Sequence, residues 1–311
     1  MKTIADILGL KYPLFQGGMA WVADWHIAAA VSEAGGLGII GVGGADENWL
    51  RDQIKKIREV TDKPFGVNLM LMNPRADEIA KVIAEEKVKV VTTGAGSAGK
   101  YIPMWKEAGC FIVPVVPSVA LAKKMERDGA DAVIAEGTES GGHVGELTTM
   151  ALVPQVVDAV SIPVLAAGGI ADGRGVAASF MLGAVGVQCG TVFLASEEVN
   201  IHQNYKDMVI KAKDTSTKVT GRSSGVPVRQ IRNQLTAKYL ELEENHASFE
   251  EMEALGAGSL RKAVVDGDTK EGTFMAGQIS GMIREIKPVK MIVDEMFSEA
   301  NKLMGDAGPV C

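Results

Sequence analysis

The chain has 311 residues, of which 47% are hydrophobic and 23% charged, so it is long enough to bury a substantial core without disulfides or metals. Its net charge of −7 argues against a nucleic-acid protein governed by phosphate contacts, unless one local patch is basic. Three cysteines without CxxC spacing, no apolar run long enough to span a bilayer and no apolar signal core at the N-terminus indicate a cytoplasmic protein without a zinc site.

Short apolar runs rich in Val, Ile and Phe alternate with segments of helical composition over the first two thirds of the chain. The predicted strands are Tyr12–Gln16, Leu37–Ile40, Phe65–Leu69, Val88–Thr92, Phe111–Val116, Ala132–Ala135, Val164–Ala167 and Val185–Gln188. The predicted helices between them include Asp46–Val60, Arg75–Glu86, Ser118–Asp128, Thr148–Val160 and Gly173–Leu182. Such alternation predicts parallel strands joined by right-handed crossovers. We therefore predict an α/β fold, a (β/α)8 TIM barrel over residues 1–198, with an open doubly wound sheet as the alternative.

The pattern changes after about Ser196. Residues 201–240 carry eight basic side chains against two acidic ones, and residues 241–254 contain six glutamates. The chain from there to about Ile283 is mostly helical in composition. We predict a helical cap over residues 199–284, inserted after the last strand. The segment 285–311 is expected to contain a final helix, Lys287–Met304, that returns to the barrel.

Glycine is in excess, with 36 residues, and the glycines cluster where the predicted strands end. A barrel of this kind builds its active site at those ends, and the loops after the last two strands commonly hold phosphate. There, Gly168-Gly169 and Gly190-Thr191 offer bare backbone and a hydroxyl, and a helix begins near Gly173. The alternative is that these glycines only close tight turns. Because GxGxxG and GxxxxGK[ST] patterns are absent, a phosphate-bearing cofactor in the barrel mouth is favoured over a Rossmann or P-loop site.

Three polar residues near the strand ends are candidates for chemistry. His143 lies in a glycine-rich segment where it can point into the mouth and donate a proton or a hydrogen bond to a developing oxyanion. The alternative is a loop histidine bonded to backbone. Glu136 closes a predicted strand, and Asn68 ends another with an amide suited to a heterocycle's donor and acceptor atoms. Cys189 has no histidine near it in sequence and is interpreted as packing.

These segments resemble one flavoenzyme superfamily over essentially the whole chain. The segments that carry the resemblance are Phe15–Ala20, Glu136–Gly145, Ala167–Ile170, Gln188–Thr191 and Phe274–Gln278. The chain resembles the FMN-dependent nitronate monooxygenase and enoyl-reductase superfamily, and within it the bacterial flavin-dependent enoyl-acyl-carrier-protein reductase II. The resemblance implies FMN in the barrel mouth. The implied cofactor-binding residues are Gly18, Met19, Asn68, Glu136, Ala167, Gly168, Gly169, Gln188, Gly190 and Thr191, and the residues implied toward substrate are Gly142 and Met275.

The resemblance further implies an activity and its partners. A trans-2-enoyl thioester of type II fatty acid synthesis would be reduced with NADH or NADPH, and His143 would hydrogen-bond the thioester oxygen or protonate the product. The alternatives are oxidation of alkyl nitronates with FMN and O2, and a non-catalytic FMN-binding barrel. Expected partners are an acyl-carrier protein, a nicotinamide dinucleotide and a second copy in a homodimer, with a monovalent cation near the site. The basic block at 201–240 would guide the carrier protein or nucleotide phosphates, form a solvated face, or pair with the 241–254 glutamates.

Overall fold

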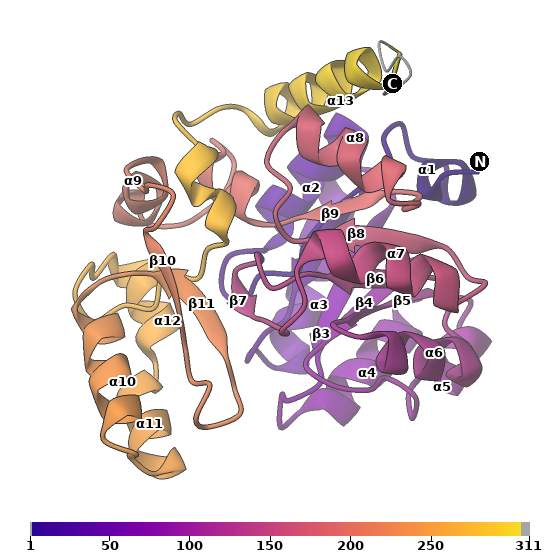
Figure 1. The fold of residues 1–311 in the computed structure, drawn as a ribbon. Coiled ribbons are helices and arrows are strands. Elements are labelled where there is room, and N and C mark those ends of the chain that lie inside the picture. Colours follow the sequence, from indigo (N-terminus) through magenta and orange to yellow (C-terminus); the bar gives the residue numbers. More distant parts are fainter. Residues whose placement is uncertain (1, 306–311) are drawn as a thin grey trace.

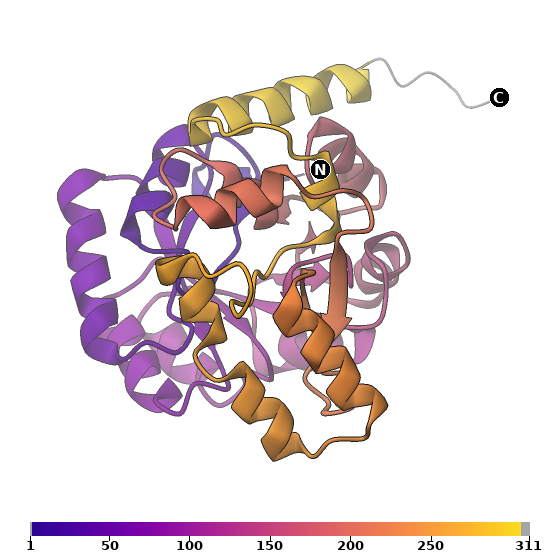
Figure 2. The ribbon, with the colours of Figure 1, turned by 90° about the vertical axis from the view of Figure 1, so that its left-hand side faces the viewer.

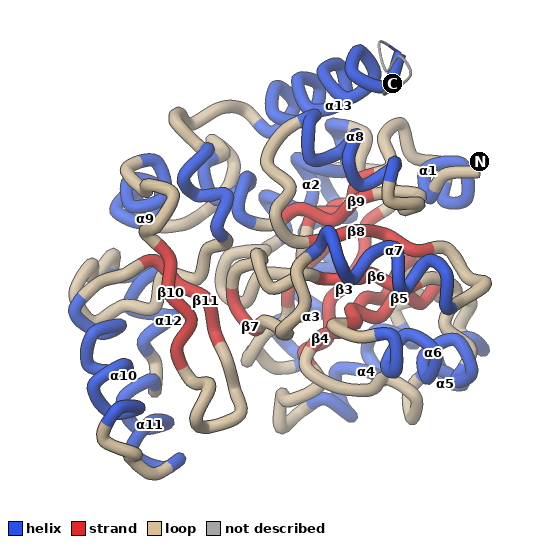
Figure 3. The backbone as a smooth tube through the Cα atoms, in the orientation of Figure 1, coloured by secondary structure: helices blue, strands red, loops and turns tan. Residues whose placement is uncertain are grey.

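The computed structural model describes residues 2–305, and its centre is an eight-stranded parallel sheet (Figures 1 and 3). The strands are β1 (Leu14–Gln16), β2 (Gly38–Gly41), β3 (Phe65–Met70), β4 (Val90–Gly94), β5 (Phe111–Val116), β6 (Val133–Glu136), β8 (Val164–Ala167) and β9 (Val187–Cys189). Their order is β1-β9-β8-β6-β5-β4-β3-β2. A parallel bridge between Phe15 and Leu37 joins the two ends of this order. The predicted (β/α)8 barrel is therefore confirmed, and the open sheet is not formed.

Helices cover the outside of the barrel. They are α2 (Trp25–Ala34), α3 (Glu47–Val60), α4 (Ala76–Glu85), α5 (Ile102–Glu107), α6 (Val119–Asp128), α7 (Thr149–Ala159) and α8 (Gly173–Met181). The short α1 (Ile4–Leu8) packs instead against the cluster inside the barrel. Local chemistry sets several of their ends. The Asp46 carboxylate accepts the Trp49 N–H at the start of α3, and the Ser118 hydroxyl caps α6 in the same way. Gly129 ends α6 with a left-handed backbone that glycine adopts without strain.

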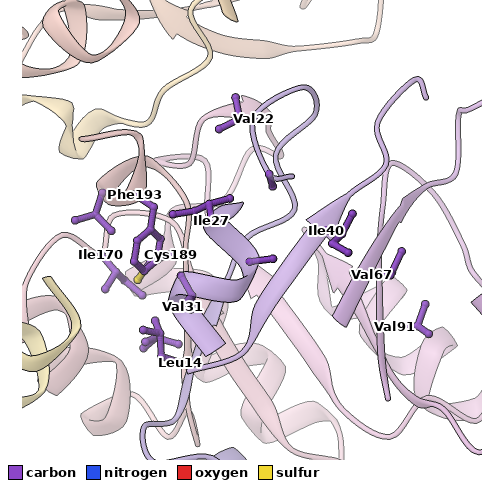
Figure 4. Close-up of a cluster of buried hydrophobic side chains, with 14 of the residues drawn as sticks. Leu14, Val22, Ile27, Val31, Ile40, Val67, Val91, Ile170, Cys189 and Phe193 are labelled. Carbon is purple, nitrogen blue, oxygen red and sulfur yellow. The ribbon is translucent and has the colours of Figure 1, made fainter. Parts of the chain in front are cut away.

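Strand residues alternate between two apolar layers. Phe15, Ile39 and Leu165 belong to the cluster inside the barrel, which α1 joins through Ile4 and Leu8. The intervening positions pack outward against the helices, as Figure 4 shows for the neighbourhood of β1 to β4. Because both faces of each strand are buried, the strands show no apolar–polar alternation in sequence.

Between β9 and the last helix the chain forms an insertion beside the barrel (Figure 1), which lies in front of it in Figure 2. It leaves after the short helix η1 (Thr191–Ala195) and returns where Lys287 bridges Ser196. Its elements are α9 (Gln203–Ile210), β10 (Thr217–Thr220), β11 (Val228–Ile231), α10 (Gln234–Glu244), α11 (Phe249–Gly256), α12 (Ser259–Arg261), η2 (Lys262–Asp266) and η3 (Gln278–Met282).

The insertion is not purely helical, which corrects the predicted helical cap. Strands β10 and β11 form an antiparallel hairpin, and β11 pairs with β7 (Gly142–His143) from the loop after β6. The β-branched residues of the hairpin and the left-handed Gly221 and Gly225 in its turn suit this structure. The pairing with β7 joins segments more than eighty residues apart, so local composition does not reveal it.

The last helix, α13 (Val289–Gly305), packs against α8 and α2 on the outside of the barrel. It lies close to the predicted range Lys287–Met304. The predicted segment 285–311 extends beyond it, and its residues 306–311, with Cys311, lie outside the described residues, as does Met1. Among the described helices, none is long and apolar enough to cross a membrane.

Candidate active site

A cavity of about 540 Å³, called here the barrel-mouth cavity, opens at the carboxyl ends of the barrel strands. Its wall includes every residue implied for cofactor, substrate or catalysis. Those residues are Gly18, Met19, Asn68, Glu136, Gly142, His143, Ala167, Gly168, Gly169, Gln188, Gly190, Thr191 and Met275. The structure thus brings together side chains spread over more than 250 residues of sequence. Their individual roles stay predictions.

The glycines after β8 and β9 serve two different purposes. A Cβ on Gly168 would lie 2.7 Å from the Gly137 carbonyl oxygen, so this glycine closes a tight turn against the β6 loop. On Gly169 and Gly190 a Cβ would meet only side-chain atoms, at 3.5 Å or more. Gly169 also has a φ of +76°, which disfavours any residue with a Cβ. Bare backbone therefore faces the cavity at Gly169 and Gly190, while the turn-closing interpretation holds for Gly168.

The amino end of α8 does not contribute to an anion site, which corrects one part of the sequence argument. The Asp172 carboxylate accepts the N–H groups of Arg174 and Gly175, and Glu299 accepts the N–H of Gly173 at 2.8 Å. Two protein carboxylates therefore occupy the positions that a phosphate would need. A phosphate site in this region is left with the loops at Gly169, Gly190 and Thr191.

Residues on β3 and β9 provide side-chain amide groups to the cavity, and Gly18 after β1 makes room for one of them. The Asn68 side-chain NH2 donates one hydrogen bond to the Thr92 hydroxyl at 2.9 Å. The Asn68 side-chain oxygen and the second N–H remain able to bond a ligand. A Cβ on Gly18 would lie 2.2 Å from the Asn68 Cβ, so Gly18 is what allows Asn68 to pack there. The buried Gln188 Oε1 has no hydrogen-bond partner in the described chain. Unspent amide groups of this kind suit a heterocycle with both donors and acceptors.

Glu136 and His143 lie at different depths in the barrel mouth, but burial shifts the pKa of each toward its uncharged form. Glu136 ends β6 with its carboxyl toward the cavity and protein on its other sides, and this burial raises its pKa to about 7. His143 stands at the rim on β7, where it is exposed to the opening yet close to much protein, and burial lowers its pKa. Both shifts favour the uncharged form. The ring of His143 makes no hydrogen bond to any residue of 2–305, so the interpretation as a backbone-bonded loop histidine finds no support.

The insertion completes the wall through Thr191 and the segment Phe274–Gln278, which sequence reasoning singled out, and through Tyr205 and Glu139, which it did not. The Tyr205 hydroxyl donates to the Met275 carbonyl at 2.8 Å, and the Gly277 N–H donates to the Thr191 hydroxyl at 2.8 Å. The Gln278 N–H donates to the backbone oxygen of Glu139 at 2.9 Å. These bonds fix the segment 274–279 across one side of the mouth. A lone tyrosine in a helix of mixed polarity and a glutamate in a glycine-rich loop carry no sequence signal for this role.

The basic block is largely paired rather than free. Lys206 is buried and donates to the Ser196 carbonyl at 2.7 Å, and Arg229 is buried against the Thr138 carbonyl. Carboxylates pair with three others, Asp207 with Lys211, Glu146 with Arg222 and Glu271 with Lys238. Within residues 2–305 no ion pair joins this block to the glutamates of 241–254, so the predicted pairing with that run is not formed.

Two further predictions concern cysteine and metal. Cys189 is buried, and burial raises the pKa of its thiol to about 12, which supports packing over nucleophilic chemistry. Among the residues described by the structure, no three His, Cys, Asp or Glu side chains gather in a way that could hold a metal ion.

Comparisons with known proteins agree with this geometry. The family model described as nitronate monooxygenase matches residues 1–86 and 77–299. The solved structure of FabK from Thermotoga maritima is 51% identical, with a TM-score of 0.95 and 98% of each chain covered. A probable nitronate monooxygenase of Staphylococcus aureus (strain MSSA476) is 33% identical, covering 97% of this chain and 98% of that protein. A hydroxy-methyl-oxo-octahydro-indene-carboxyl-CoA dehydrogenase of Mycobacterium tuberculosis is 31% identical over 96% of this chain and 95% of that protein.

Proposed function

The chain belongs to the nitronate monooxygenase family, whose members are flavin-dependent oxidoreductases, and from that premise we propose that it is an FMN-dependent enoyl-acyl-carrier-protein reductase. It would reduce the double bond of trans-2-enoyl thioesters at the expense of NADH or NADPH. The observation that carries this choice is the 51% identity to FabK along 98% of both chains, against 33% to the probable nitronate monooxygenase. The carboxyl-CoA dehydrogenase, named for a thioester, adds support for substrates of that class.

The residues of the barrel mouth fit FMN. Bare backbone at Gly169 and Gly190 leaves room for a phosphate, and the Thr191 hydroxyl, which accepts the Gly277 N–H, still has its own proton to donate. Asn68 and Gln188 offer unspent amide groups to the flavin ring. When bound, FMN would supply reversible hydride exchange between the nicotinamide and the substrate.

His143 acts on the substrate oxygen in this proposal. The double bond gains a hydride at Cβ and a proton at Cα, while NADH or NADPH becomes the oxidised nucleotide. Negative charge develops on the thioester oxygen as Cβ is reduced, and a donor held at that oxygen lowers the barrier. Because burial lowers the pKa of His143, its ring is neutral near pH 7 and has one N–H to donate. The neutral ring therefore favours hydrogen bonding over proton transfer as the main contribution of His143.

One experiment separates the two activities. The purified yellow protein is mixed with NADH or NADPH without oxygen, and the flavin absorbance is followed. We expect bleaching, and then recovery when crotonyl thioester is added. Absence of bleaching together with turnover of an alkyl nitronate in air would instead assign the monooxygenase activity. A flavin that responds to neither substrate would mean a non-catalytic binding protein.

The partners belong to the same proposal. The enoyl chain would arrive on an acyl-carrier protein, and the enzyme would act as a homodimer, with a monovalent cation near the site. Lys218 and Arg222 are exposed on the β10–β11 hairpin and are the candidates for contact with an acidic carrier. We expect activity on carrier-bound substrate to fall with salt and to lose that dependence in Lys218→Ala. If Lys218→Ala kept the salt dependence of the wild type, the basic residues of 201–240 would have a structural role only.

A further inference from the structure

A second cavity of about 270 Å³, called here the distal cavity, lies between the insertion and the loop after β3. Its walls come from the β10–β11 hairpin, helices α10, α11 and α12 and the segment at 273–275, with Met72 from the barrel loop. Apolar side chains that line it include Val226, Val228, Met252 and Phe249. None of the residues implied for FMN lines it, so the predicted cofactor set does not account for this space.

The distal cavity shares a wall with the barrel-mouth cavity. Met275 and Leu260 line both. The Met275 backbone is held, because its carbonyl accepts the Tyr205 hydroxyl and the residue bridges Gln230 in the small sheet. Its side chain has three rotatable bonds and reaches within 3.5 Å of the position that a Cβ on Gly142 would take. Met275 therefore stands with Leu260 at the boundary between the two cavities, and its side chain can turn while its backbone stays in place.

The surroundings of the distal cavity select an uncharged occupant. Within residues 2–305 no lysine or arginine lines it, and Glu253 is the one carboxylate there. Helices α10 and α11, which form two of its walls, carry six glutamates between residues 241 and 253. An anion such as a phosphopantetheine phosphate would be repelled there. Two pairs of its polar side chains are bonded to each other, Ser259 to Thr273 at 2.7 Å and Gln230 to Thr220 at 3.0 Å. The Gln230 Oε1 has no hydrogen-bond partner among the described residues, so one buried acceptor remains in this wall.

We propose that the distal cavity receives the far end of a long acyl chain, with Met275 and Leu260 as the gate between it and the reacting double bond. This inference rests on the proposed function, because the chain must enter from the barrel mouth as part of an enoyl thioester. A four-carbon chain would end within the barrel-mouth cavity, whereas a chain of about twelve carbons would pass the gate. The distal cavity then sets the range of chain lengths that the enzyme accepts.

Met252 offers a direct test. It is buried on α11 and lines the distal cavity but not the barrel-mouth cavity, so Met252→Trp fills the space without touching His143 or the cofactor residues. Steady-state kcat/KM is measured on the FMN-loaded enzyme with trans-2-butenoyl-CoA and trans-2-dodecenoyl-CoA. We expect the twelve-carbon substrate to lose about tenfold or more while the four-carbon substrate is unaffected. Met252→Leu, which nearly conserves volume, is the matched control and should preserve both values.

A binding measurement makes the result independent of turnover. Titration calorimetry of the FMN-loaded enzyme with dodecanoyl-CoA and butanoyl-CoA should show weaker dodecanoyl binding in Met252→Trp and no change in butanoyl binding. Equal losses for both chain lengths, or no loss for either, would overturn the inference. A wild-type enzyme that reduces neither thioester contradicts the proposed function, and the calorimetry then decides the inference alone. If Met252→Trp does not fold, Val226→Phe on the β10–β11 hairpin fills the same cavity and replaces it.

Discussion

The two titratable groups at the barrel mouth, Glu136 and His143, are shifted in opposite directions by the same physical cause. Burial disfavours charge, so it raises the pKa of the acid to about 7 and lowers that of the base. At pH 7 the His143 ring is therefore uncharged and the Glu136 carboxyl is about half ionised. A neutral donor held close to protein forms a stronger hydrogen bond to charge that develops on a substrate oxygen than it would in water.

For His143, we predict a large kinetic effect with little effect on cofactor content. His143→Ala should lower kcat/KM for crotonyl thioester by about 10²- to 10³-fold, because the donor at the developing oxyanion is lost. FMN absorbance of the purified variant should match that of the wild type. His143→Gln retains an N–H donor and should recover part of the rate. A Gln variant as slow as the Ala variant would mean that proton transfer is the main contribution, and full activity in His143→Ala would remove the residue from the mechanism.

For Glu136, the prediction concerns stability of the FMN-free protein. Its pKa rises from an ordinary 4.5 to about 7 on folding, so the folded state binds this proton more tightly than the unfolded state. Its contribution to the free energy of unfolding is full below pH 4.5 and is lost as pH rises through 7. The full loss amounts to about 3 kcal/mol. Urea unfolding at pH 5 and pH 8 should show a smaller decrease in Glu136→Gln than in the wild type, and equal decreases would contradict the shifted pKa.

At the scale of elements, the loops after β8 and β9 differ in whether the helix that follows them has free backbone N–H groups at its amino end. Helix α8 begins on the carboxylates of Asp172 and Glu299, so its amino end is already satisfied by the protein. The loop after β9 instead enters the short η1, where the Thr191 hydroxyl meets the Gly277 N–H of the insertion. The proposed phosphate site would therefore depend on loop backbone and on the insertion rather than on the dipole of a long helix.

This difference predicts the behaviour of a cap variant. Asp172→Ala should destabilise the protein by about 0.5–2 kcal/mol, the usual cost of a lost N-cap, and should leave FMN content unchanged. Asp46→Ala, which removes the cap of α3 at a residue that does not line the cavity, is the matched control and should lose a similar amount of stability. Tighter FMN binding in Asp172→Ala alone would show that a phosphate does approach the amino end of α8.

At the scale of the whole molecule, the barrel-mouth cavity is walled by both the barrel and the insertion, which meet through Thr191, Glu139 and Tyr205. A ligand in this cavity contacts both parts at once and binds only the folded chain. FMN at 100 times its Kd should therefore stabilise the protein by about 2.7 kcal/mol. Thermal unfolding should show a clear rise in Tm with FMN and a smaller one with riboflavin, which lacks the phosphate. Equal shifts with both compounds would contradict a phosphate site at the barrel mouth.

Much of the barrel could be predicted from sequence because its determinants are local. Val- and Ile-rich runs buried on both faces mark strands such as Phe111–Val116, and side-chain caps such as Ser118 mark where helices begin. Glycines at the strand ends indicate the mouth, because parallel strands that alternate with helices bring those ends together. The predicted site residues lie on one cavity for this reason, although sequence could not distinguish Gly168, which closes a turn, from Gly169, which leaves backbone bare.

The sequence by itself thus determined the barrel fold, the parallel direction of its strands and the end of the barrel that carries the polar groups. Each strand and helix is marked by residues close together in sequence, and their alternation implies the rest. Only the tertiary structure decided that β11 pairs with β7, that Glu299 reaches Gly173 and that Met275 stands between two cavities. The physical reason is distance along the chain. These contacts join residues more than eighty positions apart, and their partners are selected by packing of whole elements rather than by any local pattern.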